Sequence, residues 1–164
     1  MNTKSKIVKL PALKKKIARL RRQGCVIAFT NGCFDILHSG HISYLKRAKK
    51  QNRVLIVGLN SDRSVRAIKG PQRPVVQEQS RAALLAALVS VDFVVLFDAQ
   101  TPLALIKSIK PDVLIKGADW RGKGIIGSDV VRACGGKIEY IKFLSGFSST
   151  DIIKRIAKSE HAQQ

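Results

Sequence analysis

Two histidines three residues apart, His38 and His41, have the residue type and the setting for phosphate chemistry. They follow an apolar run at 25–30, which is typical of a β-strand, and they precede a helical pattern at 42–50. The N-terminus of a helix presents free backbone N–H groups and the positive end of the helix dipole, so it favours anions. Imidazoles placed there can donate hydrogen bonds to phosphate oxygens, and Gly40 lets a ligand approach the backbone closely. The pattern therefore predicts an anion site.

Two other interpretations of the histidine pair stay open at this point. The segment could be a helix-capping turn in which both histidines have only structural roles. Alternatively, histidines at positions i and i+3 can share one face of a helix and bind a metal. No Cys, Glu or third His stands at ligand spacing, since the remaining histidine is His161 near the C-terminus. A metal site is therefore not expected.

The elements that must position these side chains alternate between strand and helix along the chain. Several of the expected strands are apolar on both faces, which is typical of a sheet that is covered on both sides. The alternation predicts a single α/β domain with a Rossmann-like, doubly wound fold, in which helices cover both faces of a five-stranded parallel sheet. The expected strands are 25–30, 54–59, 92–97, 112–116 and 137–143, and the expected helices are 10–23, 42–50, 78–89, 101–110, 127–133 and 149–158.

The domain organisation that we expect has no second domain and no long linker. Residues 1–24 are predicted to form a basic helix packed on the domain. Residues 25–158 are predicted to form the α/β domain itself, and residues 159–164 a frayed tail. A basic loop with two prolines is expected at 67–76. In such folds ligands bind beyond the carboxyl ends of the strands. Polar clusters follow the first, second, fourth and fifth strands, so we expect them to meet in one site.

Composition limits the functions that the chain can have. The 164 residues are 45% hydrophobic, and no run of 18 apolar residues and no signal-peptide core is present, so membrane insertion is not expected. Three cysteines without metal-ligand spacing fit reduced thiols in the cytoplasm, which is the expected location. The formal net charge of +19 is typical of a nucleic-acid binder, but only 5% of the residues are aromatic. A solvated basic surface beside a site for anionic substrates is the preferred interpretation.

The string from Thr30 to His41, Thr-Asn-Gly-Cys-Phe-Asp-x-Leu-His-x-Gly-His, resembles the cytidylyltransferase-like nucleotidyltransferase superfamily. The resemblance implies that both histidines contact nucleotide phosphates and stabilise the transition state of attack at the α-phosphorus. It places the Thr30 hydroxyl next to the phosphates, and it makes Asp35 a candidate for the substrate side of the site, although Asp35 and Phe34 could be purely structural. The other nucleotide-binding residues that it implies are Asn31, Gly32, Phe34 and Gly40.

A polar turn and a basic segment point to one branch of this superfamily. Asn60-Ser61-Asp62 and the segment 67–75 resemble the sugar-phosphate adenylyltransferases, and more narrowly those that act on D-glycero-β-D-manno-heptose 1-phosphate. The segment is then a mobile lid, rather than an ordinary basic surface loop, and its Lys69 counts among the catalytic residues. The residues implied for substrate or phosphate binding here are Asn60, Asp62, Arg73 and Arg81.

A motif at 115–120 supports the same branch. It is similar to the Lys-Gly-Gly-Asp-aromatic motif of the heptose enzymes, with Ala118 in place of the second Gly and Trp120 in place of the usual Tyr. The resemblance places Lys116 with the substrate and Asp119 with the nucleotide, whereas without it the segment would be a strand end and a turn. An Asp-Trp pair also occurs in glycerol-3-phosphate cytidylyltransferases, so that branch stays an alternative.

The segment 146–153 resembles the Ser-Thr-Thr helix start of the family, which binds nucleotide phosphates. The segment is also an N-capped helix in any interpretation. Its first Thr is replaced here by a Ser, which keeps the hydroxyl. The nucleotide-binding residues implied are Ser148, Ser149 and Thr150, and with them the resemblance covers about residues 10–157.

The resemblance implies an enzyme that transfers AMP from ATP to D-glycero-β-D-manno-heptose 1-phosphate, giving ADP-heptose and pyrophosphate for lipopolysaccharide cores. Mg²⁺ is expected with ATP, held largely by phosphate oxygens and water. In some bacteria the domain of this branch is fused to a sugar kinase, whereas here it is expected to stand alone. The alternatives are a glycerol-3-phosphate or other alcohol-phosphate cytidylyltransferase, and a nucleic-acid-binding protein on this fold. Many relatives pair as homodimers, but no residue here identifies an interface.

Overall fold

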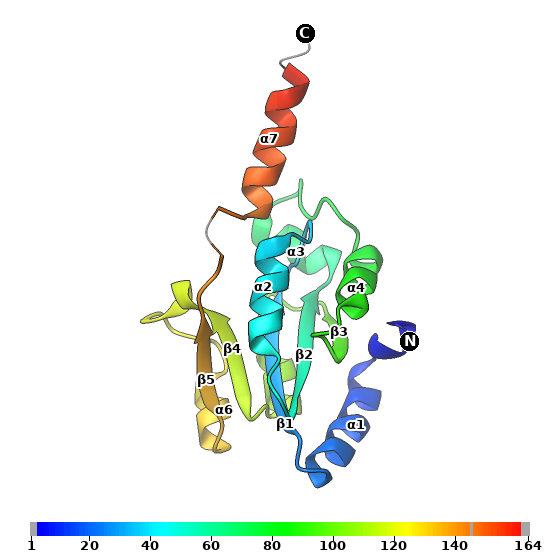
Figure 1. Cartoon of the computed structure of the whole chain (residues 1–164), viewed down its shortest axis with the longest axis vertical. Helices are drawn as coiled ribbons and strands as arrows, with labels where there is room; N and C mark the ends of the chain where they lie inside the picture. Colours follow the sequence, from blue (N-terminus) through cyan, green and yellow to red (C-terminus); the bar gives the residue numbers. More distant parts are fainter. Residues whose placement is uncertain (1–2, 145, 162–164) are drawn as a thin grey trace.

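A five-stranded sheet forms the centre of the computed structural model, which describes residues 3–144 and 146–161 (Figure 1). All strand pairs are parallel, and the strands lie in the order β3-β2-β1-β4-β5. The strands are β1 Val26–Gly32, β2 Arg53–Asn60, β3 Phe93–Phe97, β4 Val113–Gly117 and β5 Lys137–Ile141. The expected Rossmann-like, doubly wound fold class is therefore confirmed.

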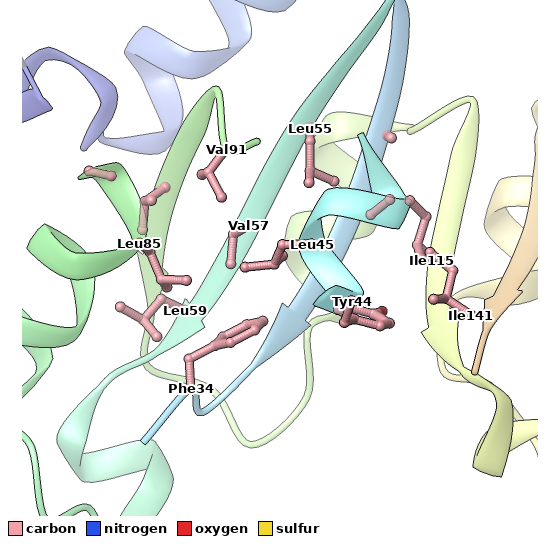
Figure 2. Packing of buried hydrophobic residues seen from close by; sticks show 14 of the residues in the cluster. Phe34, Tyr44, Leu45, Leu55, Val57, Leu59, Leu85, Val91, Ile115 and Ile141 are labelled. Carbon is pink, nitrogen blue, oxygen red and sulfur yellow. The ribbon is translucent and has the colours of Figure 1, made fainter. Parts of the chain in front are cut away.

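Helices cover both faces of this sheet and bury most of its apolar side chains. One layer contains Tyr44 and Leu45 of the helix after β1 and Leu85 of the helix before β3, packed on Val57 and Ile115 of the strands (Figure 2). The opposite layer packs three other helices on the alternate strand residues. The helices are α1 Leu10–Arg22, α2 Ser39–Ala48, α3 Asp62–Lys69, α4 Glu78–Ala87, α5 Leu103–Ile109, α6 Ser128–Ala133 and α7 Ser149–His161, and the 3₁₀ turns are η1 Thr3–Lys6 and η2 Ala118–Trp120.

The N-terminal helix α1 packs on the layer of α5 and α6. Leu13 and Ile17 are buried there, four residues apart on one face of the helix. The opposite face carries Lys15, Arg19 and Arg22, all exposed. Helix α1 is therefore amphipathic, with an apolar face packed on the domain and a basic face exposed to solvent.

Helix α3 is not among the expected helices, because the sequence pattern assigns Asp62 to a polar turn, 67–69 to the basic loop and 63–66 to no element. Ser61 caps it, since the Ser61 hydroxyl accepts a hydrogen bond from the Ser64 backbone N–H at 3.1 Å. The basic loop therefore begins only at Gly70. At the other end of the chain, α7 continues to His161, past the expected end at 158, and residues 162–164 lie outside the described residues.

The sheet opens between β1 and β4 at its carboxyl edge. Strand β1 pairs with β2 along its whole length, but it pairs with β4 only at Ala28 and Phe29. The winding of the chain also reverses between these two strands, which is the switch point where doubly wound folds bind their ligands. No helix among the described residues is long and apolar enough to cross a membrane.

Candidate active site

The two histidines lie together at the start of α2, at the carboxyl edge of β1. His38 is the N-cap residue of the helix, and His41 lies in its first turn. Their rings stack with centroids 3.9 Å apart and an interplanar angle of 24°. The ring of Phe34 lies 5.2 Å from that of His41. The histidine pair therefore occupies the helix start that the sequence predicts.

The Nδ1 atoms of both histidines are buried and have no hydrogen-bond partner among the described residues. Histidines that served only to hold the turn would use these atoms, because buried polar groups with structural roles are almost always paired. Since nothing accepts a proton from Nδ1, a neutral ring keeps its proton on Nε2. Each ring can then donate one hydrogen bond through Nε2 to a ligand.

Both rings are neutral at pH 7. The pKa of His41 is lowered from 6.5 to about 4, mainly by burial and also by the neighbouring His38, while Asp35 acts in the opposite direction. Burial also lowers the pKa of His38. A phosphate that binds here therefore meets neutral hydrogen-bond donors, and the positive potential must come from helix dipoles and from lysine or arginine.

The depressed pKa of His41 predicts a pH dependence of stability. The unfolded chain binds a proton at the histidine near pH 6.5, whereas the folded chain binds it only near pH 4. The unfolded state therefore takes up more protons between these values, and stability falls as the pH falls through this window, by at most about 1.4 kcal/mol per pH unit for one group. Urea unfolding at pH 7, 5.5 and 4.5 should show a smaller decrease for His41→Gln than for the wild type. An equal decrease would contradict the assignment.

The start of α7 meets the start of α2. The Ser148 hydroxyl accepts a hydrogen bond from the Asp151 N–H at 3.0 Å, so Ser148 caps the helix. The Ser149 hydroxyl donates to the Asp35 backbone carbonyl, in the turn that carries the histidines. Thr150 is exposed. Two helix N-termini thus lie at one place, while the rest of α7 projects away from the sheet (Figure 1).

Gly40 leaves room for two neighbouring side chains, those of His38 and Phe147. A Cβ atom at this position would lie 2.9 Å from the His38 ring and 3.1 Å from the Phe147 Cβ. The glycine therefore lets the histidine ring and the segment before α7 pack onto the first turn of α2. The polar cluster expected after the fifth strand spans 145–150, and its first residue, 145, lies outside the described residues.

The opening between β1 and β4 holds Lys116. Its Nζ donates to the Asn31 Oδ1 atom at 2.6 Å and lies 5.7 Å from the centroid of the Trp120 ring. Burial lowers the pKa of Lys116 to about 8. Asp119 is exposed at the rim, in η2. The structure thus brings Asn31, Lys116 and Asp119 to the switch point.

Thr30 contacts α2, the helix that carries the histidines. Its side chain is buried, and its hydroxyl shares a hydrogen bond of 2.9 Å with the Tyr44 hydroxyl. The Tyr44 ring in turn stacks on Phe143, with centroids 5.0 Å apart. The predicted place of the Thr30 hydroxyl next to the phosphates stays a prediction. Tyr44 was missed, although its position three residues after His41 on one helix face could have indicated it.

Four residues predicted to bind the substrate have partners inside the protein instead. The Asp35 carboxylate is buried against the segment 73–76, and Arg81 is fully buried. The Asn60 side chain is buried and donates to the Ser64 hydroxyl at 2.9 Å. Asp62 accepts a hydrogen bond from Arg81 at 2.7 Å. The structure thus gives these side chains partners within the protein, and their roles in substrate binding stay predictions.

The basic residues of the predicted lid, Lys69 and Arg73, lie beside a cavity next to α7. Lys69 is the last residue of α3 and is exposed, and Arg73 follows in the loop. Both line a cavity of about 270 Å³ together with Gly70, Pro71, Gln72, Val75 and Ile153 of α7. The Arg73 Nε lies 3.1 Å from the Asp35 carboxylate, so part of its charge is already paired. Gly32, the last residue of β1, lies against the ring of Phe34.

The chain resembles known proteins in both its sequence and its fold. Residues 29–155 match the family model described as cytidylyltransferase-like. The chain is 49% identical over 152 residues to the bifunctional protein HldE of Magnetococcus marinus, and 55% identical over 141 residues to the protein of that name in Campylobacter fetus. These matches cover 93% and 86% of this chain but 31% and 30% of the relatives. The chain therefore spans about a third of the length of the curated relatives that it matches.

Two solved structures resemble the chain. A lipopolysaccharide core biosynthesis protein from Thermoplasma volcanium has a TM-score of 0.58 and 30% identity, and the match covers 73% of this chain and 96% of that one. A pantoate-beta-alanine ligase from Francisella tularensis has a TM-score of 0.56 and 20% identity, with 96% and 79% of the two chains covered. The second likeness concerns the fold alone.

Proposed function

The chain belongs to the cytidylyltransferase-like family, and on that premise we propose that it transfers AMP from ATP to D-glycero-β-D-manno-heptose 1-phosphate. The products are ADP-heptose and pyrophosphate, and ADP-heptose supplies lipopolysaccharide core synthesis. The observation that carries the nucleotidyl transfer is the stacked, neutral pair His38 and His41, placed where the N-termini of α2 and α7 meet.

A sugar phosphate as the acceptor is supported by three observations. The motif at 115–120 resembles that of the heptose branch, and its Lys116 lies at the switch point beside Asn31. The Thermoplasma volcanium protein, 30% identical, is described as a lipopolysaccharide core biosynthesis protein. The relatives are named bifunctional, and the chain covers about a third of their length, as expected if their remainder is a second enzyme such as a sugar kinase.

The proposed reaction is an in-line displacement at phosphorus. An oxygen of the sugar 1-phosphate attacks the α-phosphorus of ATP, the bond from that phosphorus to the bridging oxygen breaks, and pyrophosphate leaves with both bonding electrons. His38 and His41 donate from Nε2 to phosphate oxygens on which negative charge grows, and the N–H groups at the start of α7 face the same anion. Lys69 and Arg73 approach from the side of the cavity beside α7. No covalent intermediate with the enzyme is needed, because positioning and charge stabilisation suffice.

Mg²⁺ is proposed to enter with ATP. In the ranges 3–144 and 146–161, no three His, Cys, Asp or Glu side chains are grouped to hold a metal ion. The starts of α2 and α7 present N–H donors, which suit phosphate oxygens rather than a hard cation. The ion would therefore be held by phosphate oxygens and water, and it would neutralise part of their charge.

Pyrophosphate release tests the proposal directly. ATP and CTP are each combined with heptose 1-phosphate and with glycerol 3-phosphate in the presence of Mg²⁺. We expect release only with ATP and the heptose phosphate. Release only with CTP and glycerol phosphate would keep the histidine mechanism and move the chain to the cytidylyltransferase branch. No release with any pair would overturn the proposed function.

Two further expectations stay predictions. The homodimer has no interface assigned to it. The nucleic-acid alternative rests on the charge, and the exposed cations Lys15, Arg19 and Arg22 of α1 lie on the face of that helix turned away from the sheet. Binding of RNA or DNA with a steep dependence on salt would support this alternative.

A further inference from the structure

Two buried charged residues, Asp35 and Arg81, have no part in the mechanism proposed above. Asp35 lies in the turn 33–38 that leads to the histidines, here called the histidine turn, and Arg81 contacts this turn from α4. The side chains of Asp35 and Arg81 are 3% and 1% exposed. A buried charge is costly unless hydrogen bonds and an opposite charge compensate it. The partners of these two residues therefore indicate what the charges hold together.

Asp35 connects the histidine turn to two other segments of the site. Its carboxylate accepts hydrogen bonds from the backbone N–H groups of Val75 and Val76, at 3.0 to 3.1 Å, and it pairs with the Arg73 Nε at 3.1 Å. Its backbone carbonyl accepts from the Ser149 hydroxyl at the start of α7. One residue thus links the turn, the basic loop and α7.

Arg81, on α4, also links the histidine turn to the basic loop. Its Nε donates to the Val76 carbonyl at 2.8 Å, its Nη1 to the Cys33 carbonyl at 2.5 Å and its Nη2 to the Asp62 carboxylate at 2.7 Å. The planar fork of a guanidinium carries five N–H donors in fixed directions, so a single side chain can bind acceptors on three separate segments. The three acceptors belong to the histidine turn, the basic loop and α3.

The turn that these residues hold is strained. Phe34 and Ile36, on either side of Asp35, have φ angles of 46° and 50°. Non-glycine residues adopt this left-handed conformation at a cost, and it persists where the surroundings fix it. The contacts of Asp35 and Arg81 are such surroundings, and His38 follows two residues after Ile36.

We propose that Asp35 and Arg81 are positioning residues, which form a clamp that locks the basic loop and the start of α7 onto the turn carrying the histidines. The clamp touches neither substrate, and it sets the distance between the histidine donors and the cations of the basic loop. This inference rests on the proposed function, since the reaction is what the aligned groups serve. It places the predicted substrate residues Asp35 and Arg81 behind the site, not in it.

Arg81→Lys tests the clamp, because lysine keeps the charge and loses the fork. Arg53→Lys is a matched control: Arg53 is also buried, and its guanidinium donates to the Ala48 carbonyl and to Glu139, both at 2.9 Å, at the amino edge of the sheet. At a temperature where circular dichroism finds both variants folded, we expect kcat of Arg81→Lys to fall on the order of 10- to 100-fold. Arg53→Lys should stay within about twofold of the wild type.

Hydrogen exchange gives a readout that does not need activity. The amides of Val75 and Val76 should exchange at least about tenfold faster in Arg81→Lys and not in Arg53→Lys, since their protection depends on the clamp. If Arg81→Lys does not fold, Asp35→Asn loosens the same loop from the other side and should show the same two effects. Unchanged exchange and kcat, or equal losses in Arg53→Lys, would overturn the clamp. A wild type without activity would overturn the proposed function instead, and exchange would still decide on the clamp.

Discussion

Replacing His41 by alanine should reduce kcat by about 100- to 1000-fold and leave the fold intact. This is the loss that typically follows removal of one donor to developing charge. The ring is neutral, because burial holds its pKa near 4, and its Nδ1 has no partner among the described residues. Its Nε2 proton is therefore the group that the substitution removes from the phosphate. His38→Ala should have an effect of the same order, because His38 stacks on His41 and offers the same donor.

The geometry also predicts which substitutions restore part of the activity. The amide nitrogen of glutamine lies near the position of a histidine Nε2, and that of asparagine near Nδ1. His41→Gln should therefore be more active than His41→Asn or His41→Ala in the pyrophosphate assay. His161→Ala, at the far end of α7, is the matched control and should be as active as the wild type. Near wild-type turnover in a folded His41→Ala variant would refute the assignment.

The sequence was sufficient to predict the sheet and the place of the histidines. Long apolar runs mark the strands, and the string from 30 to 41 keeps its strand, turn and helix start in one continuous segment, so a local pattern locates it. Helix α3 was missed because its eight residues include five charged or serine side chains and bury only Ser64 and Val65. Val65 and Ile68 lie on one face of the helix, but two apolar residues in about two turns are too short a pattern to distinguish a helix from a polar loop.

The roles of Asp35 and Arg81 could not be predicted in the same way. Asp35 binds backbone groups 40 and 41 residues away, and Arg81 reaches a carbonyl 48 residues away. Backbone partners leave no trace in the residue types, so an arginine near a phosphate motif is taken for a phosphate ligand. In the folded chain both charges bind groups of its own loops, and the proposed contacts with the substrates fall to Lys69, Lys116 and the helix N-termini.

Substitution of Lys116 by methionine should reduce kcat/KM by about 10- to 100-fold, which corresponds to loss of one charge-assisted hydrogen bond of about 1.5 to 3 kcal/mol. Lys116 is the cation at the opening between β1 and β4, and Asn31 holds its Nζ there at 2.6 Å. Methionine preserves the apolar stem beside Trp120 and removes only the charge. Lys137→Met, on the exposed start of β5, serves as the matched control and should have no effect.

The pH profile distinguishes a cation that binds the substrate from one that only packs. Burial lowers the pKa of Lys116 to about 8, so the free enzyme loses this charge as the pH rises through that value. If the charge binds an anionic substrate, kcat/KM of the wild type should decrease on the alkaline side with an apparent pKa near 8. Lys116→Arg keeps its charge throughout this range, so its profile should stay flat to higher pH, whatever its absolute rate. An alkaline decrease with the same midpoint in Lys116→Arg would mean that another group titrates, and Lys116 would then lose its place in substrate binding.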